Sequence, residues 1–119
     1  MQIVVVDDSK AMRSIVMRAV RQAGYGATFL EAGNGTEALA TIRANQPNLV
    51  LCDWNMPEMT GIELLKKLRE EGNQVRVGFV TSESDAATRD VAFQAGASFL
   101  ITKPFTPDAL KAALGPVLG

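Results

Sequence analysis

Side chains that can bind ions or act as nucleophiles follow several short apolar runs of the chain. An acidic pair, Asp7-Asp8, follows the first run, and Asp53 follows another. Thr81 and Lys103 follow two further runs. Carboxylates can ligate a hard cation or attack as nucleophiles, whereas ammonium and hydroxyl groups can hold anionic oxygens. The chemistry therefore depends on whether the fold brings these residues together.

The absence of some residue types excludes several kinds of catalytic and metal-binding site. The 119 residues contain no histidine and 1 cysteine, which excludes Ser-His-Asp catalysis, His-ligated zinc, an internal disulfide and a phosphohistidine of the chain's own. The 12 basic and 13 acidic residues are spread evenly over both halves, so we expect no nucleic-acid binding. We expect neither a membrane span nor a signal peptide, and therefore a soluble cytoplasmic protein.

Apolar runs alternate with segments of helical spacing along the whole chain. Continuous β-branched and apolar runs are typical of buried parallel strands, and they cover residues 3–6, 28–30, 49–52, 75–80 and 99–101. Helical spacing of apolar residues follows each run, over residues 12–20, 38–42, 62–68, 91–95 and 109–114. The ends of successive strands lie 24, 22, 28 and 22 residues apart, which is the size of a repeated βα unit. The pattern predicts a single α/β domain over residues 1–119.

Residues that start or stop helices support these boundaries. Ser9 is a suitable N-cap for the first helix, and Thr106-Pro107 fits the N-cap and first position of the last. Gly24 and Gly96 suit left-handed stops after the first and fourth helices. Gly115-Pro116 is expected to end or break the last helix.

Five βα units with right-handed crossovers predict a doubly wound sheet, whose ligand site lies at the carboxyl ends of the strands. We adopt the flavodoxin-like strand order 2-1-3-4-5 from known proteins of this class; the sequence does not itself fix it. In that order the first and third strands are neighbours, so Asp7-Asp8 and Asp53 converge. Thr81 and Lys103 belong to the same rim.

Three carboxylates in one crevice repel one another, and Lys103 alone compensates only part of their charge. A divalent cation resolves the repulsion. Oxygen ligands with no histidine and no cysteine pair favour a hard ion, Mg²⁺ or alternatively Mn²⁺. A phosphoryl group is a natural further ligand for such an ion.

Four motifs carry a resemblance to a known family: the acidic pair Asp7-Asp8, the segment Asp53-Trp54-Asn55-Met56-Pro57, Thr81 followed by a small residue, and Lys103-Pro104-Phe105. With these motifs the chain resembles a two-component receiver domain. The resemblance covers essentially the whole chain and fits the single-domain, CheY-like type without an output domain. It implies that Asp53 is the phosphoacceptor. It further implies that Asp8, Asp53 and the Asn55 carbonyl bind Mg²⁺ directly, that Asp7 acts mostly through a coordinated water, and that Lys103 and Thr81 hold phosphoryl oxygens.

The resemblance assigns roles to further positions. Asn55 and Glu83 would flank the phosphoryl group and tune its hydrolysis, and the Lys103-Pro104 peptide bond would be cis. Leu100 stands where such receivers usually carry a switch aromatic that works with the threonine, and Phe99 is one residue away. We therefore expect a switch in which Thr81 and Leu100 act without the usual ring movement.

The expected function is to accept a phosphoryl group from a histidine kinase or a histidine phosphotransfer protein. The protein would catalyse only its own phosphoryl uptake and hydrolysis, and would change its affinity for a downstream target through the fourth helix, fifth strand and fifth helix. Chemotaxis-type signalling is the first interpretation, and a phosphorelay intermediate or a non-flagellar receiver is the alternative. We expect a monomer, with a phosphorylation-dependent dimer as the alternative.

Other classes fit the residues less well. A haloacid-dehalogenase-like phosphatase needs a second acid two residues after its nucleophile, where this chain has Asn55. A flavodoxin-like cofactor carrier needs hydroxyls and glycines where Asp7-Asp8 would repel a phosphate. A receiver acting as an unphosphorylated scaffold would not need the complete acceptor set. The basic residues of the first helix form either a solvated face or a docking surface for an acidic partner: Lys10, Arg13, Arg18 and Arg21.

Overall fold

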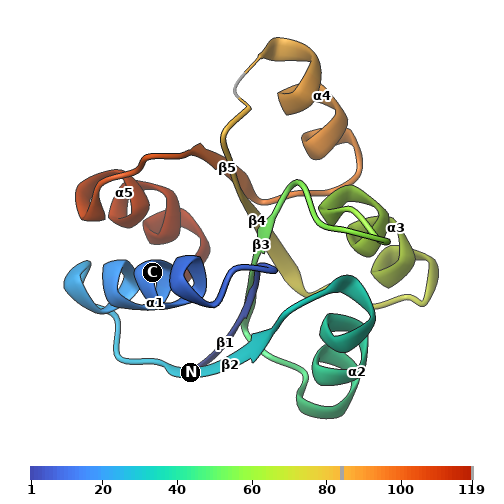
Figure 1. The fold of residues 1–119 in the computed structure, drawn as a ribbon, viewed down its shortest axis with the longest axis horizontal. Helices are drawn as coiled ribbons and strands as arrows, with labels where there is room; N and C mark the ends of the chain where they lie inside the picture. Colours follow the sequence, from blue (N-terminus) through green and yellow to red (C-terminus); the bar gives the residue numbers. More distant parts are fainter. Residues whose placement is uncertain (84, 119) are drawn as a thin grey trace.

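The computed structural model describes residues 1–83 and 85–118 as strands alternating with helices (Figure 1). The elements are β1 (Gln2–Val6), α1 (Lys10–Gln22), β2 (Thr28–Ala32), α2 (Gly35–Asn45), β3 (Leu49–Asp53), α3 (Gly61–Glu70), β4 (Arg76–Thr81), α4 (Ala86–Gln94), β5 (Phe99–Thr102) and α5 (Pro107–Leu118). All strands pair in parallel in the order β2-β1-β3-β4-β5. The predicted doubly wound fold is confirmed.

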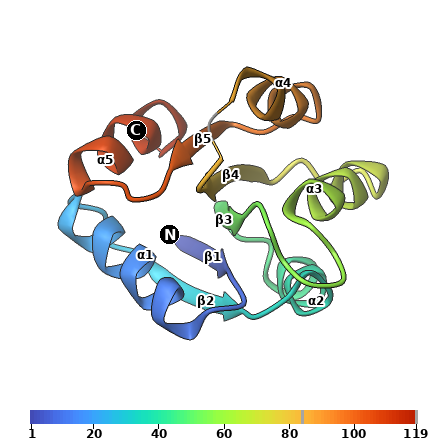
Figure 2. The same ribbon diagram turned by 45° about the horizontal axis from the view of Figure 1, so that its top comes forward.

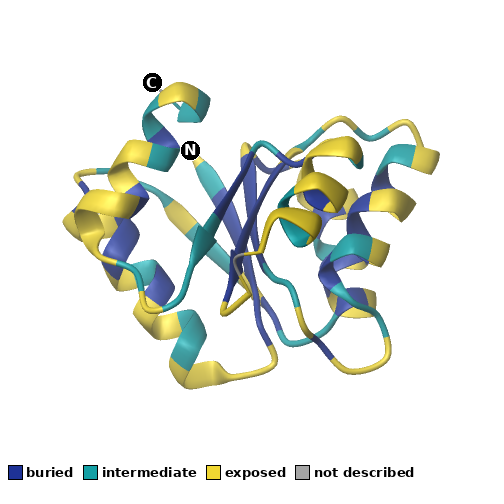
Figure 3. Cartoon of the chain, turned by 90° about the horizontal axis from the view of Figure 1, so that it is seen from above, coloured by how far each residue is buried: buried dark blue, intermediate teal, exposed yellow. Residues whose placement is uncertain are grey.

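Helices cover both faces of the sheet. The helices α1 and α5 lie on one face, and α2, α3 and α4 lie on the other (Figures 1 and 2). Two apolar clusters fill the spaces between the layers, so the central strands β1, β3 and β4 are mostly buried while the outer helix surfaces face solvent (Figure 3). The edge strand β2 is largely accessible. Within the described residues, no helix combines the length and apolar character needed to cross a membrane.

Alternation along each strand divides the core between the two faces. Cys52, for example, pairs with Val6 and Phe79 in register, and all three belong to the cluster under α2, α3 and α4. Phe99 belongs to the opposite cluster, where its ring occupies the space beside Gly78. The strand interiors are thus fixed by packing, which leaves their carboxyl ends to carry polar side chains.

The first and last helices begin, and the first and fourth helices end, at the predicted capping residues. The Ser9 hydroxyl accepts a hydrogen bond of 3.2 Å from the Met12 amide at the start of α1. The Thr106 hydroxyl accepts one of 3.1 Å from the Ala109 amide at the start of α5. Gly24 and Gly96 follow α1 and α4 with φ of 98° and 104°, which is the left-handed stop that favours glycine.

The expected break at Gly115-Pro116 is wrong, because α5 continues through both residues to Leu118. Proline fits a helical φ, but it lacks an amide hydrogen and crowds the carbonyl four residues before it, so its place in the helix has a cost that other contacts must offset. The last turn gains compensating contacts. Val117 and Leu118 pack against the core, and Arg76 Nη1 donates a 2.7 Å hydrogen bond to the Val117 carbonyl.

A packing prediction follows from Gly78. A Cβ atom at this position would overlap the Phe99 ring, so we expect Gly78→Ala to lower the free energy of unfolding by about 1–3 kcal/mol through overpacking. Gly26→Ala is the matched control, since a Cβ there meets no atom within 4 Å. Urea denaturation measures both, and a Gly78→Ala protein as stable as the control would contradict the close packing of Phe99.

Candidate functional site

The carboxyl ends of the strands bring together the side chains singled out by the sequence. Asp53 is the last residue of β3, and Asp7 and Asp8 directly follow the neighbouring β1. Thr81 ends β4, and Lys103 directly follows β5. Four strands therefore contribute to one rim of the sheet, as expected for the site of a doubly wound fold.

The three aspartates form a candidate cation site. One carboxylate oxygen from each of Asp7, Asp8 and Asp53 lies within 4.8 Å of the others. Asp7 is buried, Asp53 is partly buried and Asp8 is exposed. A purely oxygen donor set, open to solvent through Asp8, fits a hard ion that keeps several waters, as Mg²⁺ does. This placement is what the sequence led us to expect.

Lys103 joins the two inner carboxylates. Its Nζ atom lies 3.2 Å from Asp53 Oδ1 and 3.4 Å from Asp7 Oδ2. The peptide bond from Lys103 to Pro104 is cis. The Lys103 amide donates a 2.6 Å hydrogen bond to the Thr81 carbonyl, so the lysine is anchored to the neighbouring strand end. The ammonium group is in position to stabilise negative charge at Asp53.

The electrostatics of Asp53 show that one lysine is insufficient. Burial raises the pKa of Asp53 above its usual range, and the Asp7 carboxylate raises this pKa further. The charge of Lys103 and its hydrogen bond lower the pKa of Asp53 but do not cancel these effects. An ionised Asp53 is therefore held at a cost, which a bound divalent cation would relieve.

Thr81, Asn55 and Glu83 lie next to one another at the rim. The Thr81 side chain is buried, and its hydroxyl accepts a 3.0 Å hydrogen bond from the Glu83 amide. The Asn55 side-chain amide donates a 3.3 Å hydrogen bond to Glu83 Oε1. Asn55 and Glu83 are themselves exposed. The loops after β3 and β4 are thus linked beside the acidic cluster, with polar groups facing solvent.

The neighbours of Asp53 are structural. Cys52 is fully buried, and burial, followed by the charges of Asp53 and Asp7, raises the pKa of its thiol. This thiol donates a 3.2 Å hydrogen bond to the Asp53 carbonyl. Trp54 is partly exposed and meets Phe79 edge-on, with ring centroids 5.0 Å apart. Its indole is therefore placed to report changes at Asp53.

Register separates the two candidates for the position of the switch aromatic. Leu100 is buried, pairs with Phe79 and belongs to the cluster under α4. Phe99 belongs to the cluster on the opposite face of the sheet. Alternation places Thr81 on the same face as Phe79, so Leu100, and not Phe99, shares a face with the threonine. No aromatic ring therefore takes the place that Leu100 fills.

The basic residues of α1 divide into two kinds. Lys10 and Arg18 are exposed. Arg13 is turned inward onto Asp7 and Glu31, and Arg21 lies over the Phe29 ring at 4.9 Å from its centroid. The contacts of Arg13 escaped the sequence analysis, although an acid at the end of the neighbouring strand was a usable signal. Arg13 and Arg21 therefore also serve the fold.

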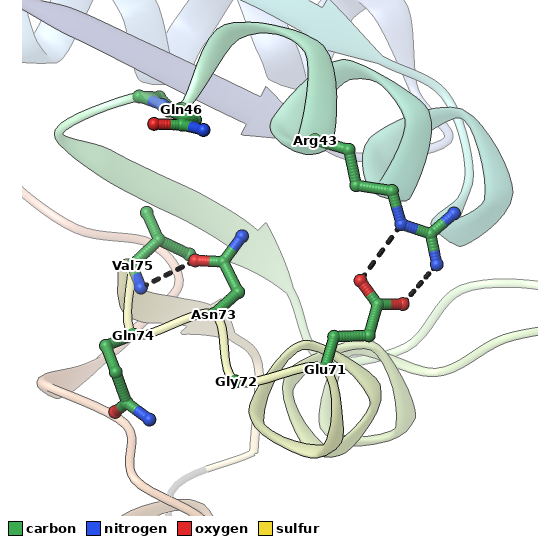
Figure 4. A pocket seen from close by; sticks show the side chains of 8 residues that line it. Arg43, Gln46, Glu71, Gly72, Asn73, Gln74 and Val75 are labelled. Carbon is green, nitrogen blue, oxygen red and sulfur yellow. Dashed lines mark hydrogen bonds and ion pairs between the residues drawn. The ribbon is translucent and has the colours of Figure 1, made fainter.

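A separate hollow lies at the opposite edge of the sheet, beside the starts of β3 and β4 (Figure 4). It has a volume of about 500 Å³ and is lined by amide side chains and an ion pair. In that pair the Arg43 guanidinium bonds both carboxylate oxygens of Glu71. This hollow contains no nucleophile beside a cation site, so the acidic rim is the candidate functional site.

Fold and rim together define a doubly wound α/β domain with a cluster of three aspartates beside a lysine. The sequence pattern described as the response regulator receiver domain matches residues 3–115. The chain belongs to this family.

Relatives and solved structures agree with the family. The chain is 42% identical to the chemotaxis protein CheY1 of Helicobacter pylori, covering 100% of this chain and 98% of that protein. It is 41% identical to the CheY homolog of Campylobacter jejuni, covering 100% and 93%. The chemotaxis protein CheY4 of Vibrio cholerae superposes with a TM-score of 0.85 at 31% identity over 98% of both chains. The receiver domain of NarL from Mycobacterium tuberculosis gives 0.87 at 31%, covering 99% and 96%.

The raised pKa of Asp53 predicts that the free energy of unfolding depends on pH. Because the pKa of Asp53 is higher in the folded protein than in the unfolded chain, protonated Asp53 adds to the free energy of unfolding. This contribution is fully present below the usual pKa of an aspartate, roughly 3.9, and is lost as the pH rises through the pKa of Asp53 in the folded protein. Without metal, Asp53→Asn should therefore be more stable than the wild type at pH 7, and the difference should shrink toward pH 4.

Urea unfolding in EDTA at several pH values measures this difference. Asp90→Asn, which changes an exposed acid on α4 by the same chemistry, is the control. A metal-free Asp53→Asn protein less stable than the wild type at pH 7 would contradict the charge assignment.

Proposed function

We propose that this protein is a single-domain response regulator that accepts a phosphoryl group on Asp53 with the help of Mg²⁺. The observation that carries the proposal is the position of the Asp53 carboxylate between two further aspartates and the Lys103 ammonium, 3.2 Å away. This arrangement supplies a nucleophile, a cation site and a fixed positive charge at one point of the rim.

The proposed donor is a phosphohistidine on a histidine kinase or a histidine phosphotransfer protein, which membership of the receiver domain family supports. The chain has no histidine and cannot supply this group itself. An Asp53 carboxylate oxygen attacks the phosphorus, the new O–P bond forms, and the P–N bond to the donor breaks with its electrons returning to the imidazole. Phosphoryl transfer has a loose, charge-spread transition state, so it needs positioning and charge stabilisation more than a general base.

Each rim residue has a definite task in this proposal. Asp8, Asp53 and the Asn55 carbonyl would hold Mg²⁺ directly, and Asp7 would act mostly through a coordinated water. The ion would supply charge neutralisation and orientation of the phosphoryl oxygens. Lys103 would bind one phosphoryl oxygen. The Thr81 hydroxyl, now bonded by the Glu83 amide, would rotate its proton toward another.

We propose a signalling phosphoacceptor and not an enzyme with an external substrate. The position two residues after Asp53 is Asn55, which bonds Glu83, whereas a haloacid-dehalogenase-like phosphatase needs an acid there. Mn²⁺ would be accepted in place of Mg²⁺, because both ions favour oxygen ligands. The proposal includes a cytoplasmic location, which the similarity to CheY proteins over the full chain supports.

Chemotaxis-type signalling is the proposed setting, supported by the similarity to CheY proteins over the full chain. The proposed output surface for an unknown downstream protein comprises α4, β5 and α5. There α4 presents Phe93, which is 48% exposed. A phosphorelay intermediate is the second candidate within the same family. We propose a monomer before phosphorylation.

Labelling tests the proposal directly. Acetyl phosphate with Mg²⁺ should add one base-labile phosphoryl group, because an acyl phosphate is a reactive mixed anhydride. Intact-mass measurement should show this addition in the wild type, and Asp53→Asn or EDTA should abolish it. Asp90→Asn should be labelled like the wild type. Labelling that persists in Asp53→Asn would overturn the assignment.

Hydrolysis of the phosphoryl group tests Asn55 and Glu83. Both side chains are exposed and linked at 3.3 Å beside the acceptor, so their replacement should leave the core intact. We expect Glu83→Ala and Asn55→Ala to change the dephosphorylation rate several-fold and to leave phosphoryl uptake nearly unchanged. Stopped-flow fluorescence of Trp54 can follow both steps. Equal effects on uptake and loss would show that these residues act only through metal binding.

A further inference from the structure

Arg13 is the member of the basic run on α1 that turns toward the acidic rim. Its side chain is 15% exposed, and its Nη1 atom donates a 2.6 Å hydrogen bond to the Asp7 carbonyl oxygen. Its Nε atom lies 3.0 Å from Glu31 Oε1, on strand β2. A largely buried guanidinium needs partners for its donors, and these two groups provide them on opposite sides.

The two residues of the acidic pair are held very differently. Asp7 is fixed through its backbone amide, which bonds the Ala32 carbonyl at 3.1 Å, and through its carbonyl, which bonds Arg13. Its carboxylate accepts bonds from the Ser9 amide at 2.9 Å and from Lys103 at 3.4 Å. Asp8 is exposed, and among residues 1–83 and 85–118 no hydrogen bond to its carboxylate is present.

The direction of the Asp8 side chain therefore depends on the peptide group that precedes it. That peptide contains the Asp7 carbonyl, the atom to which Arg13 bonds. Rotation of this peptide plane would move the Asp8 carboxylate relative to Asp7 and Asp53, whose oxygens it must approach to complete the cluster. A fixed peptide plane is thus a condition for a fixed third ligand.

We propose that Arg13 and Glu31 form a positioning pair that orients the Asp7-Asp8 peptide and so presents Asp8 to the cation. The inference rests on the proposed function, because it assumes that Asp8 is a ligand. Glu31, on the neighbouring strand β2, holds the Arg13 guanidinium in place. Arg13 in turn restrains the Asp7-Asp8 peptide through its hydrogen bond to the Asp7 carbonyl. Groups behind the first ligands commonly contribute to metal affinity in this way.

The residue types suit this role. A guanidinium presents several donors in a rigid fork and can bond two acceptors on different sides, whereas a lysine ammonium is a single point on a flexible stem. The arrangement is therefore more specific than a placement of positive charge near three acids.

Mg²⁺ titration followed by Trp54 fluorescence tests the inference. We expect Arg13→Met to weaken Mg²⁺ binding roughly tenfold. Arg21→Met is the matched control, because it removes the same charge from the same helix and loses a contact with Phe29 on the same strand. The control should bind Mg²⁺ nearly as the wild type does. Arg13→Lys should stay weaker than the wild type, although it keeps the charge.

A second readout separates positioning from damage to the fold. At saturating Mg²⁺, Arg13→Met should be labelled by acetyl phosphate at nearly the wild-type rate, since Asp53, Thr81 and Lys103 are unchanged. The defect should thus lie in the Mg²⁺ concentration required and not in the maximal rate. Glu31→Gln, which changes an exposed side chain, should show a smaller shift in the same direction and serves if Arg13→Met does not fold.

The outcomes are distinct. Wild-type Mg²⁺ affinity in Arg13→Met, or in Glu31→Gln if Arg13→Met does not fold, overturns the inference, as does full affinity in Arg13→Lys, which would show that charge alone matters. If the wild type itself neither responds to Mg²⁺ nor is labelled at Asp53, the proposed function fails and the inference fails with it.

Discussion

The repulsion among carboxylates at one end of the sheet is the constraint on which the site depends. Parallel strands in this order bring Asp7 and Asp53 to adjacent positions, and Lys103 reaches both from β5 at 3.4 and 3.2 Å. Its ammonium group links residues at the ends of three strands, but an excess of negative charge remains. Burial, together with the remaining charge of Asp7, raises the pKa of Asp53. The excess of negative charge at the rim is therefore a property of the fold, and it is what the proposed cation would neutralise.

The alternation of strands and helices and the residues of the rim could be predicted from the sequence, because both depend on where the strands end. Continuous apolar runs locate buried parallel strands, and residues that follow such runs must share one edge of the sheet. Asp7, Asp53, Thr81 and Lys103 could be placed together without any knowledge of side-chain contacts. The strand order was adopted from known proteins, since local sequence patterns contain no information about which strands are neighbours.

Two features could not be predicted from local patterns because they depend on tertiary contacts. The last helix passes through Pro116 because Val117 and Leu118 gain core contacts and Arg76 caps the helix end. Arg13 turns inward because Glu31 and the Asp7 carbonyl are close in space. Each outcome reflects a partner distant in sequence or a neighbour that only the fold supplies.

The same contacts indicate which elements could respond to the phosphoryl group proposed at Asp53. Leu100 is buried beside its strand partner Phe79 in the cluster under α2, α3 and α4, so it cannot move outward without opening a cavity in the core. The helix α4 is held more weakly, since Ala92 is its single buried residue. Val91 and Phe93, on either side of Ala92, are 45% and 48% exposed. An element with so small an apolar anchor can shift at low free-energy cost. A pull on Thr81, at the end of β4, would therefore be accommodated by α4 more readily than by the packed strand beneath it.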